Sequence, residues 1–310
     1  MNKDYLKNFY KFTVEDFTDF HKKAYPHANE RTHKSFNQSL KRIEIIYKKP
    51  LNQLQLCFLD DAKDTFEKFK STDYSHQTNI TTFCMLLKIL KMLSVPIDQY
   101  NKFQNILNLE VKKNNIVREE DLHEKLNFLP SFEEIRNLLR EKIDDLNETS
   151  TFDDVKYLLI LSMMVLSVPL KLMQYTKMGI VFVKPESKYM NNFLVEDQEG
   201  NFYVKSGEIT IKINDSHLIK LIKLWINEYN TTKHFFIQHE QAKTGMNNKQ
   251  LRIALNTASR QYLGEALSNG EIRSLYMKNL MDLDPSFKEK LQVSSLLGYK
   301  NNNILELHKV

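Results

Sequence analysis

Apolar residues follow a helical period over much of the first half of the chain. Between residues 30 and 47 they recur three and four positions apart, at Phe36, Leu40, Ile43 and Tyr47. This spacing predicts an amphipathic helix, and Pro50 predicts its end because proline has no backbone N–H to donate. Further helices are predicted in LNQLQLCFLDDAKDTFEKF, where Asp60 and Asp61 suit the positive end of the helix dipole, and over residues 77–94.

The pattern is lost between Asn114 and Asn127, where the chain is polar and shows no sustained period. Such a stretch is typical of a connector between domains. The helical pattern resumes in FLPSFEEIRNLLREKID, where Ser131 followed by Glu134 predicts a capping box at a helix start. The sequence therefore predicts two domains, residues 1–126 and 127–310, as its length also favours.

Strand-like stretches are confined to the second domain. Helical patterns at residues 131–146 and 153–167 precede them, and four helical patterns follow at 217–229, 248–263, 272–282 and 286–297. Between these groups lie IVFVKP, NNFLVEDQEG, NFYVKSG and EITIKIND. In the last stretch Ile209, Ile211 and Ile213 alternate with polar residues, which predicts a half-buried strand, and KSG before it predicts a hairpin turn. The predicted fold is mostly α with a small antiparallel sheet, an α+β class.

Composition narrows the class of protein. With 42% hydrophobic residues, 27% charged residues and few Gly or Pro, the chain is expected to be globular. A net charge of +5 permits a polyanionic partner without requiring one. Cys57 and Cys84 both lie in apolar stretches, so we expect neither a disulfide framework nor a zinc site. The apolar run from Tyr157 to Val168 is too short to span a bilayer, and no secretory signal is expected, so we expect an intracellular protein without a membrane partner.

Five stretches together resemble the tyrosine recombinase (phage integrase) family in order and spacing. They are QTNITTFCMLLKILKML, FLPSFEEIRNLL, VKSGEITIKIND, GEIRSLYMKNLM and VSSLLGYKNNNILELHKV. The resemblance covers roughly residues 30–310, and its last part is most similar to integrase-like proteins of large eukaryotic DNA viruses. It implies a helical core-binding (SAM-like) DNA-binding domain in 1–126 and a catalytic-type domain in 127–310. It also implies double-stranded DNA as the partner, possible homo-oligomers on DNA, and no cofactor, because this transesterification conserves bond energy.

The family's chemistry requires cations around one phosphorus atom. Arginine forks meet the oxygens of a negatively charged phosphorane, a lysine protonates the leaving 5′-oxygen, and a tyrosine attacks phosphorus. Carried over by the resemblance, Lys205 in KSG is the hairpin lysine and Arg273 in GEIR is the second arginine. The alternative interpretations are a solvated turn lysine and a surface arginine.

Other positions depart from the family pattern. Lys171, in LSVPLKLMQ, stands at the first arginine and loses the guanidinium fork, unless it is only a solvated lysine. Gly270 stands where the family has a histidine. Tyr299 occupies the penultimate His or Trp position, or is a plain core tyrosine. The spacing places the nucleophile at His308, whose nitrogen can in principle attack phosphorus. The combination predicts a degenerate active site.

Two further groups have competing interpretations. The lysines of the second and third predicted helices either form a solvated surface or lie along DNA phosphates; they are Lys63, Lys68, Lys70, Lys88 and Lys91. His234, His239 and Glu240 form an HxxxxHE cluster around FFIQ, but no further ligand lies nearby in the sequence, so we expect no metal site.

Three functions remain open. The first is a DNA-binding protein of the tyrosine recombinase or integrase family with impaired or lost strand transfer, serving DNA recombination, integration or genome processing. The second is an active recombinase that uses His308 as nucleophile. The third is a structural virion or scaffold protein that retains the fold. We expect the protein in the nucleus or cytoplasm of a host cell, or in a virion.

Overall fold

The chain forms two compact units, Met1–Asp121 and Leu122–Val310, which are described separately. The computed structural model describes residues 13–53, 61–92, 95–182, 192–207, 209–229, 233–240, 242–284, 286, 289–290, 293–294 and 297. Half of the predicted helix at 286–297 therefore lies outside the described residues. Within them, no helix is both long enough and apolar enough to cross a bilayer.

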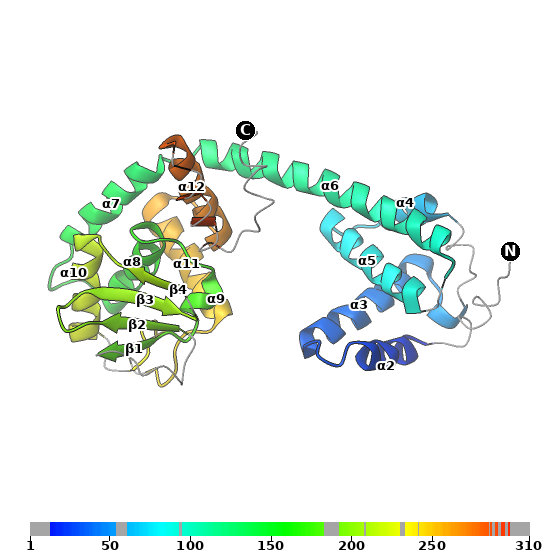
Figure 1. The fold of residues 1–310 in the computed structure, drawn as a ribbon, viewed down its shortest axis with the longest axis horizontal. Coiled ribbons are helices and arrows are strands. Elements are labelled where there is room, and N and C mark those ends of the chain that lie inside the picture. Colours follow the sequence, from blue (N-terminus) through cyan, green and yellow to red (C-terminus); the bar gives the residue numbers. More distant parts are fainter. Residues whose placement is uncertain are drawn as a thin grey trace. The chain divides into compact units, whose positions relative to one another are not determined.

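The first unit is helical throughout its described part (Figure 1). Its elements are α2 (Val14–Ala24), α3 (Glu30–Tyr47), η1 (Leu51–Gln53), α4 (Ala62–Lys70), α5 (His76–Met92) and α6 (Ile97–Asn127). The predicted helix at 30–47 is confirmed: the Asn29 side chain accepts a hydrogen bond from the Thr32 amide, and Lys48 ends the helix with a φ of 53°. Asp61 caps α4 by accepting from the Lys63 and Asp64 amides, and Asp60 lies outside the described residues.

The stretch at 114–127, predicted as a connector between domains, belongs to the continuous helix α6, and the division between the two units falls within it. Every residue from 115 to 121 is exposed. Apolar residues recur at helical spacing only where one face of a helix is buried. This exposed stretch therefore shows no such period in its sequence, although its backbone is helical.

Aromatic rings fill the core of the first unit. The rings of Phe36, Phe66, Phe69, Phe83 and Phe103 are almost fully buried. Phe83 meets Phe66 edge to face, with centroids 5.0 Å apart, and stacks on Phe103 with centroids 5.5 Å apart. Such pairs stabilise beyond the area they bury, so the apolar positions of α3, α4, α5 and α6 meet in one cluster.

The described part of the second unit combines helices with one small sheet. Its helices are α7 (Phe132–Asp144), α8 (Phe152–Val165), α9 (Leu172–Tyr175), α10 (Ser216–Leu224), α11 (Asn248–Leu263) and α12 (Asn269–Asp282), and α10 continues as a π-helix, η3 (Trp225–Tyr229). The strands are β1 (Gly179–Phe182), β2 (Asn192–Glu196), β3 (Phe202–Ser206) and β4 (Ile209–Lys212), in that order across the sheet. The predicted capping box at Ser131 and Glu134 is confirmed.

The sheet is mixed, which corrects the prediction of an antiparallel one. β2, β3 and β4 are antiparallel neighbours, but β1 runs parallel to β2, with Gly179 opposite Phe193. The alternation of side chains is the same in both kinds of ladder, so it predicts a strand but not the direction of its partner. The predicted alternation in β4 is confirmed, because Ile211 is buried while Thr210 and Lys212 are exposed.

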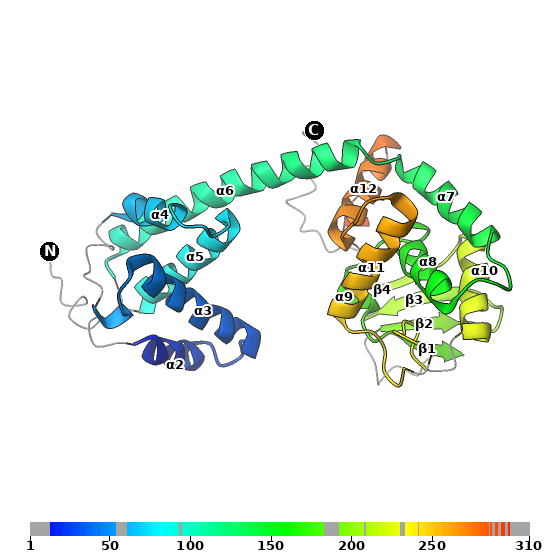
Figure 2. The same cartoon turned by 180° about the vertical axis from the view of Figure 1, so that it is seen from behind.

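Helices α8 and α11 lie on one face of the sheet, as the two opposite views agree (Figures 1 and 2). Phe202 and Val204 of β3 point into the apolar core, together with most of α8. Because α8 packs on several neighbours, its apolar residues surround it on all sides. The core thereby fixes one face of β3 and leaves the other face to polar residues.

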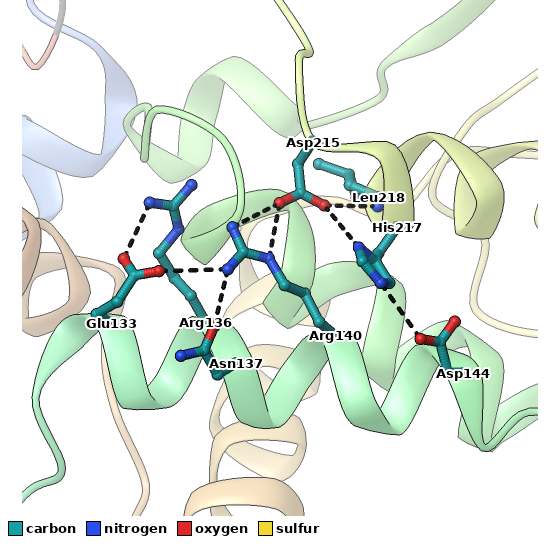
Figure 3. Close-up of polar contacts among 8 residues, drawn as sticks. All are labelled: Glu133, Arg136, Asn137, Arg140, Asp144, Asp215, His217 and Leu218. Carbon is teal, nitrogen blue, oxygen red and sulfur yellow. Dashed lines mark hydrogen bonds and ion pairs between the residues drawn. The ribbon is translucent and has the colours of Figure 1, made fainter.

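A polar network joins α7 to the start of α10 (Figure 3). Arg140 holds Asp215 by two contacts of 3.1 and 3.0 Å and Glu133 by one of 3.2 Å. The Asp215 side chain also caps α10 by accepting from the Leu218 amide at 3.0 Å. The side chain of Asp215 is only 6% exposed, so its charge depends on this guanidinium for stabilisation.

We expect Asp215→Ala to lower the free energy of unfolding of the second unit by about 2–4 kcal/mol, because a helix cap is lost and a half-buried guanidinium loses its partner. The only tryptophan, Trp225, is buried in this unit, so its fluorescence during urea unfolding reports on this unit. The matched control is Asp145→Ala, at an exposed aspartate that pairs with Lys142 at 3.0 Å; its effect should stay within about 0.5 kcal/mol. Equal effects of the two changes would contradict the role given to Asp215.

Candidate functional site

Helix α12, which carries Arg273, begins three residues before the predicted start at Ile272. Ser268 caps it by accepting from the Glu271 amide at 3.3 Å, and the Glu271 side chain accepts from the Ser268 amide in return. This Ser-x-x-Glu capping box has the same pattern as the one at Ser131 and was available in the sequence. It places Arg273 in the second turn of the helix.

Asn269, the first residue of α12, holds the segment that carries Lys171. Its Oδ1 accepts from the Leu172 amide at 3.2 Å, and its Nδ2 donates to the Leu170 carbonyl at 2.9 Å. The backbone is therefore fixed on both sides of Lys171, whose own side chain is exposed. The two predicted cation positions lie on segments joined by one amide group.

A buried tyrosine supports the same segment from the core. The Tyr175 hydroxyl accepts from the Leu170 amide at 3.2 Å and lies 3.3 Å from the Val168 carbonyl. Burial raises the pKa of Tyr175, while the Leu170 hydrogen bond and the charge of Arg273 oppose that rise. The phenol therefore stays neutral beside the arginine, and the loop before α9 is held between Tyr175 and Asn269.

Glu271 precedes Arg273 by two residues, and its negative charge is compensated locally. Lys125 donates to the Glu271 carboxylate at 2.6 Å and to the Ala266 carbonyl at 3.0 Å. Burial alone would raise the pKa of Glu271, but hydrogen bonds from Lys125 and Ser268 lower it. Glu271 is thus an anion already paired, which leaves the start of α12 without an unpaired carboxylate at this position.

The end of the described chain contacts Arg273. Its guanidinium donates to the carbonyl of Leu297, whose side chain is buried. This contact brings the start of the C-terminal segment to α12. Tyr299 and His308 lie outside the described residues, so their predicted roles remain predictions.

Lys205 lies in β3, opposite Phe193 of β2 and Thr210 of β4. Since successive side chains of a strand alternate between faces, Lys205 lies on the face turned away from the core-facing Val204. The next residue, Ser206, donates to Asn192 at 2.6 Å. Asn192 in turn donates to two carbonyls around α9, each at 3.2 Å. The strand of Lys205 is therefore linked to α9, the helix that follows Lys171.

The five lysines predicted to face DNA contact different elements of the first unit. Lys68 lies over the Tyr47 ring at 4.3 Å, and Lys88 lies 5.5 Å from the Tyr25 ring centroid. Lys70 pairs with Glu67 at 3.0 Å and with Glu110 at 3.8 Å. Lys63 and Lys91 are exposed. No contact gathers these lysines into one site, and their role in binding DNA remains a prediction.

The described residues contain no group of three or more His, Cys, Asp or Glu side chains placed to hold a metal ion. In the HxxxxHE cluster, His234 instead forms an isolated β-bridge with Gly179. FFIQ, which the sequence suggested as a strand, forms none: Phe235, Phe236 and Ile237 are buried in an irregular segment. Trp225 helps to hold that segment by donating to the Phe235 carbonyl at 2.8 Å.

Comparison with known proteins identifies the fold. No protein-family model matches the chain, and no curated protein matches its sequence. The structure is similar to that of the Tn1549 transposon integrase solved in complex with transposon right-end DNA, with a TM-score of 0.56 and 11% identity over 96% of this chain and 95% of that chain. XerA recombinase also matches, with a TM-score of 0.37 and 12% identity over 99% of both chains, which is too low to carry an argument.

The likeness to the Tn1549 integrase shows that the chain has the fold of a tyrosine recombinase. The predicted fold class, mostly α with a small sheet, is therefore confirmed. At 11% identity the likeness concerns the fold and not the activity.

We expect Asn269→Ala to lower the free energy of unfolding of the second unit by about 1–3 kcal/mol, because it removes two hydrogen bonds at a partly buried position. Urea unfolding followed by Trp225 fluorescence measures the change. Asn269→Asp keeps the acceptor for Leu172 but not the donor for Leu170, so it should be intermediate. The matched control is Asn248→Ala, at an exposed asparagine that is likewise the first residue of a capped helix. If both alanine variants behave alike, Asn269 does not hold the Lys171 segment.

Proposed function

We propose that this chain binds double-stranded DNA through the tyrosine-recombinase fold, with strand transfer impaired or lost. The observation that carries the proposal is the link between the Lys171 segment and the helix of Arg273 through Asn269. The fold likeness to an integrase solved on DNA supports the choice of partner.

Charge supports binding of a phosphate at this position. Lys171 is an exposed ammonium group, and Arg273 lies one helical turn beyond Asn269, where Leu172 is bound. An ammonium acts as a point charge on a phosphate, whereas a guanidinium can also form two parallel hydrogen bonds. Affinity for a ground-state phosphodiester needs mainly such charges. Catalysis additionally needs proton transfer and a nucleophile.

Several of the groups needed for catalysis depart from the family pattern, although Lys205 and Arg273 match it. Lys171 lacks the fork of the first arginine, and Gly270 lacks the imidazole. Lack of space for a Cβ atom does not explain Gly270, because a Cβ atom built there would meet only the Ser268 hydroxyl, at 3.7 Å. The absence of an imidazole at this position supports the proposal that proton transfer is impaired.

The proposal extends to the biological setting. The similarity of the last residues to integrase-like proteins of large eukaryotic DNA viruses supports a role in recombination, integration or genome processing. On this proposal the protein acts in the nucleus or cytoplasm of a host cell, or in a virion, and possible homo-oligomers form on DNA.

We expect the protein to bind duplex DNA with an affinity that falls steeply as salt rises, because bound phosphates release counterions. Arg273→Ala should weaken binding by about tenfold or more, since a charge-assisted hydrogen bond contributes about 1.5–3 kcal/mol. Arg273→Lys keeps the charge and should lose less. Fluorescence anisotropy with a labelled duplex measures both, and Trp225 fluorescence checks that each variant is folded. If the affinity for duplex DNA changes neither with the salt concentration nor with the Arg273 substitutions, the result would favour a structural virion or scaffold protein.

A nicked suicide duplex tests strand transfer directly. We expect no covalent protein–DNA adduct from the native chain after denaturation. An adduct that disappears in His308→Ala would instead establish an active recombinase with a histidine nucleophile. The control is the variant carrying Lys171→Arg, Gly270→His and His308→Tyr together, which restores the three missing groups and shows whether the assay can detect an adduct on this scaffold.

A further inference from the structure

Helices α2 and α3 run side by side in the first unit (Figures 1 and 2). A groove is lined by residues of both helices. Its volume is about 490 Å³. The side chains used below are Thr18 and Lys22 from α2 and His33, Lys34, Asn37 and Lys41 from α3. On α3 they recur at helical spacing, so one face of that helix supplies most of the groove.

The groove is cationic. Lys22, Lys34 and Lys41 line it against a single carboxylate, Glu30. Lys34 pairs with Glu30 at 2.9 Å and Lys22 with Asp19 at 3.3 Å, but both pairs are exposed. Exposed pairs contribute little free energy, so a phosphate can replace these carboxylates. Lys41 is exposed and forms no ion pair among the described residues.

Neutral donors lie between the lysines. The Asn37 side chain donates to the Thr18 hydroxyl at 3.2 Å, and Thr18 donates to the Val14 carbonyl at 2.7 Å. These bonds fix the two helices together beside the lysines. The groove is therefore built by packed polar contacts and is not a chance gathering of surface charges.

His33 is held by a buried histidine. Its Nδ1 lies 3.0 Å from Nδ1 of His21, a side chain that is 1% exposed. The His21 ring stacks on Phe36, with centroids 4.1 Å apart and an angle of 13° between the rings. Only one proton fits between the two nitrogens, so one ring donates and the other accepts. Nε2 of His33 makes no hydrogen bond to any described residue.

The location of an additional proton follows from burial. Burial, together with the charges of Lys88 and His33, lowers the pKa of His21 to about 4. A proton taken up by the pair therefore resides on His33, at the groove, and not on the buried His21. The titratable and charged groups around the pair are Lys22 of α2, Tyr25 after it, Glu30, Lys34 and Lys41 of α3, and Lys88 of α5.

We propose that the α2–α3 groove binds a phosphate group of duplex DNA together with one proton taken up by His33. The choice of duplex DNA as the source of the phosphate rests on the proposed function. In the bound state Nδ1–H of His33 donates to Nδ1 of His21, and Nε2–H of His33 donates to a phosphate oxygen. The proton comes from solvent and returns to it on release. The three lysines supply the remaining positive charge.

The pH dependence has a definite sign. The imidazolium form of His33 attracts the anion, so affinity is highest at acidic pH and falls as the pH rises and that proton is lost. One linked proton limits the slope to about tenfold per pH unit. Between pH 5.5 and 8 at constant ionic strength, we expect the affinity for a labelled duplex to fall by about five- to tenfold.

Three variants test this assignment by fluorescence anisotropy. His33→Gln keeps a hydrogen-bonding group beside His21 but cannot take up the proton, so most of the pH dependence should disappear. The matched control His27→Gln removes an exposed histidine in the turn before α3. This change should leave the pH dependence of the affinity unchanged. Lys41→Gln should lower affinity and reduce the slope of log affinity against log salt by about one, while the pH dependence stays. A His33→Gln variant with the native pH dependence overturns the proposal.

Two negative outcomes can be told apart: that the groove is not a phosphate site, and that the proposed function is wrong. If the native protein binds no duplex at any pH, the proposed function fails and the groove is tested with inorganic phosphate alone. Imidazole NMR signals of the native protein, assigned with His33→Gln, then show whether phosphate shifts His33 but not His27. A selective shift supports a groove for free phosphate and overturns duplex DNA as its ligand. No shift overturns the groove as a phosphate site altogether.

Discussion

The candidate site of the second unit depends on one side-chain amide. Asn269 offers an acceptor and a donor on a planar group, and the backbone around Lys171 satisfies both. Without Asn269, the Leu172 amide and the Leu170 carbonyl would need other hydrogen-bond partners beside the start of α12. Polar groups left unsatisfied there are costly in free energy. The arrangement of Lys171, α9 and the strand of Lys205 follows from this bond and from the links made by Asn192.

The two units use charge in different ways. In the second unit, Glu271 is paired with Lys125 and the buried Asp215 with Arg140. In the first unit, the ion pairs along the α2–α3 groove are exposed and weak. Paired buried charges stabilise a fixed geometry, whereas exposed pairs can be exchanged for a ligand. The same residue types therefore serve the fold in one unit and are available to a partner in the other.

Elements with one buried face were predictable from the sequence, and elements without one were not. Helix α3 and strand β4 place apolar residues with a clear period because each packs on a core. Residues 115–121 of α6 bury no face, and the alternation of side chains in β1 does not reveal the direction of its partner strand. Lys171 and Arg273 were predicted as site residues through the resemblance, and their roles stay predictions. Asn269 was missed because an amide that bonds to a distant backbone has no local pattern. The Ser268 capping box would have placed it at a helix start.

The exposed part of α6 has a consequence for ancestry. Between residues 115 and 121 no side chain is buried, so selection there acts only on the tendency of each residue to favour a helix. Exchanges among Lys, Glu, Arg and Gln alter that tendency by only a few tenths of a kcal/mol. Such a segment can replace nearly all its residues while its backbone is unchanged. In this segment, sequence similarity to related proteins will therefore disappear long before structural similarity does.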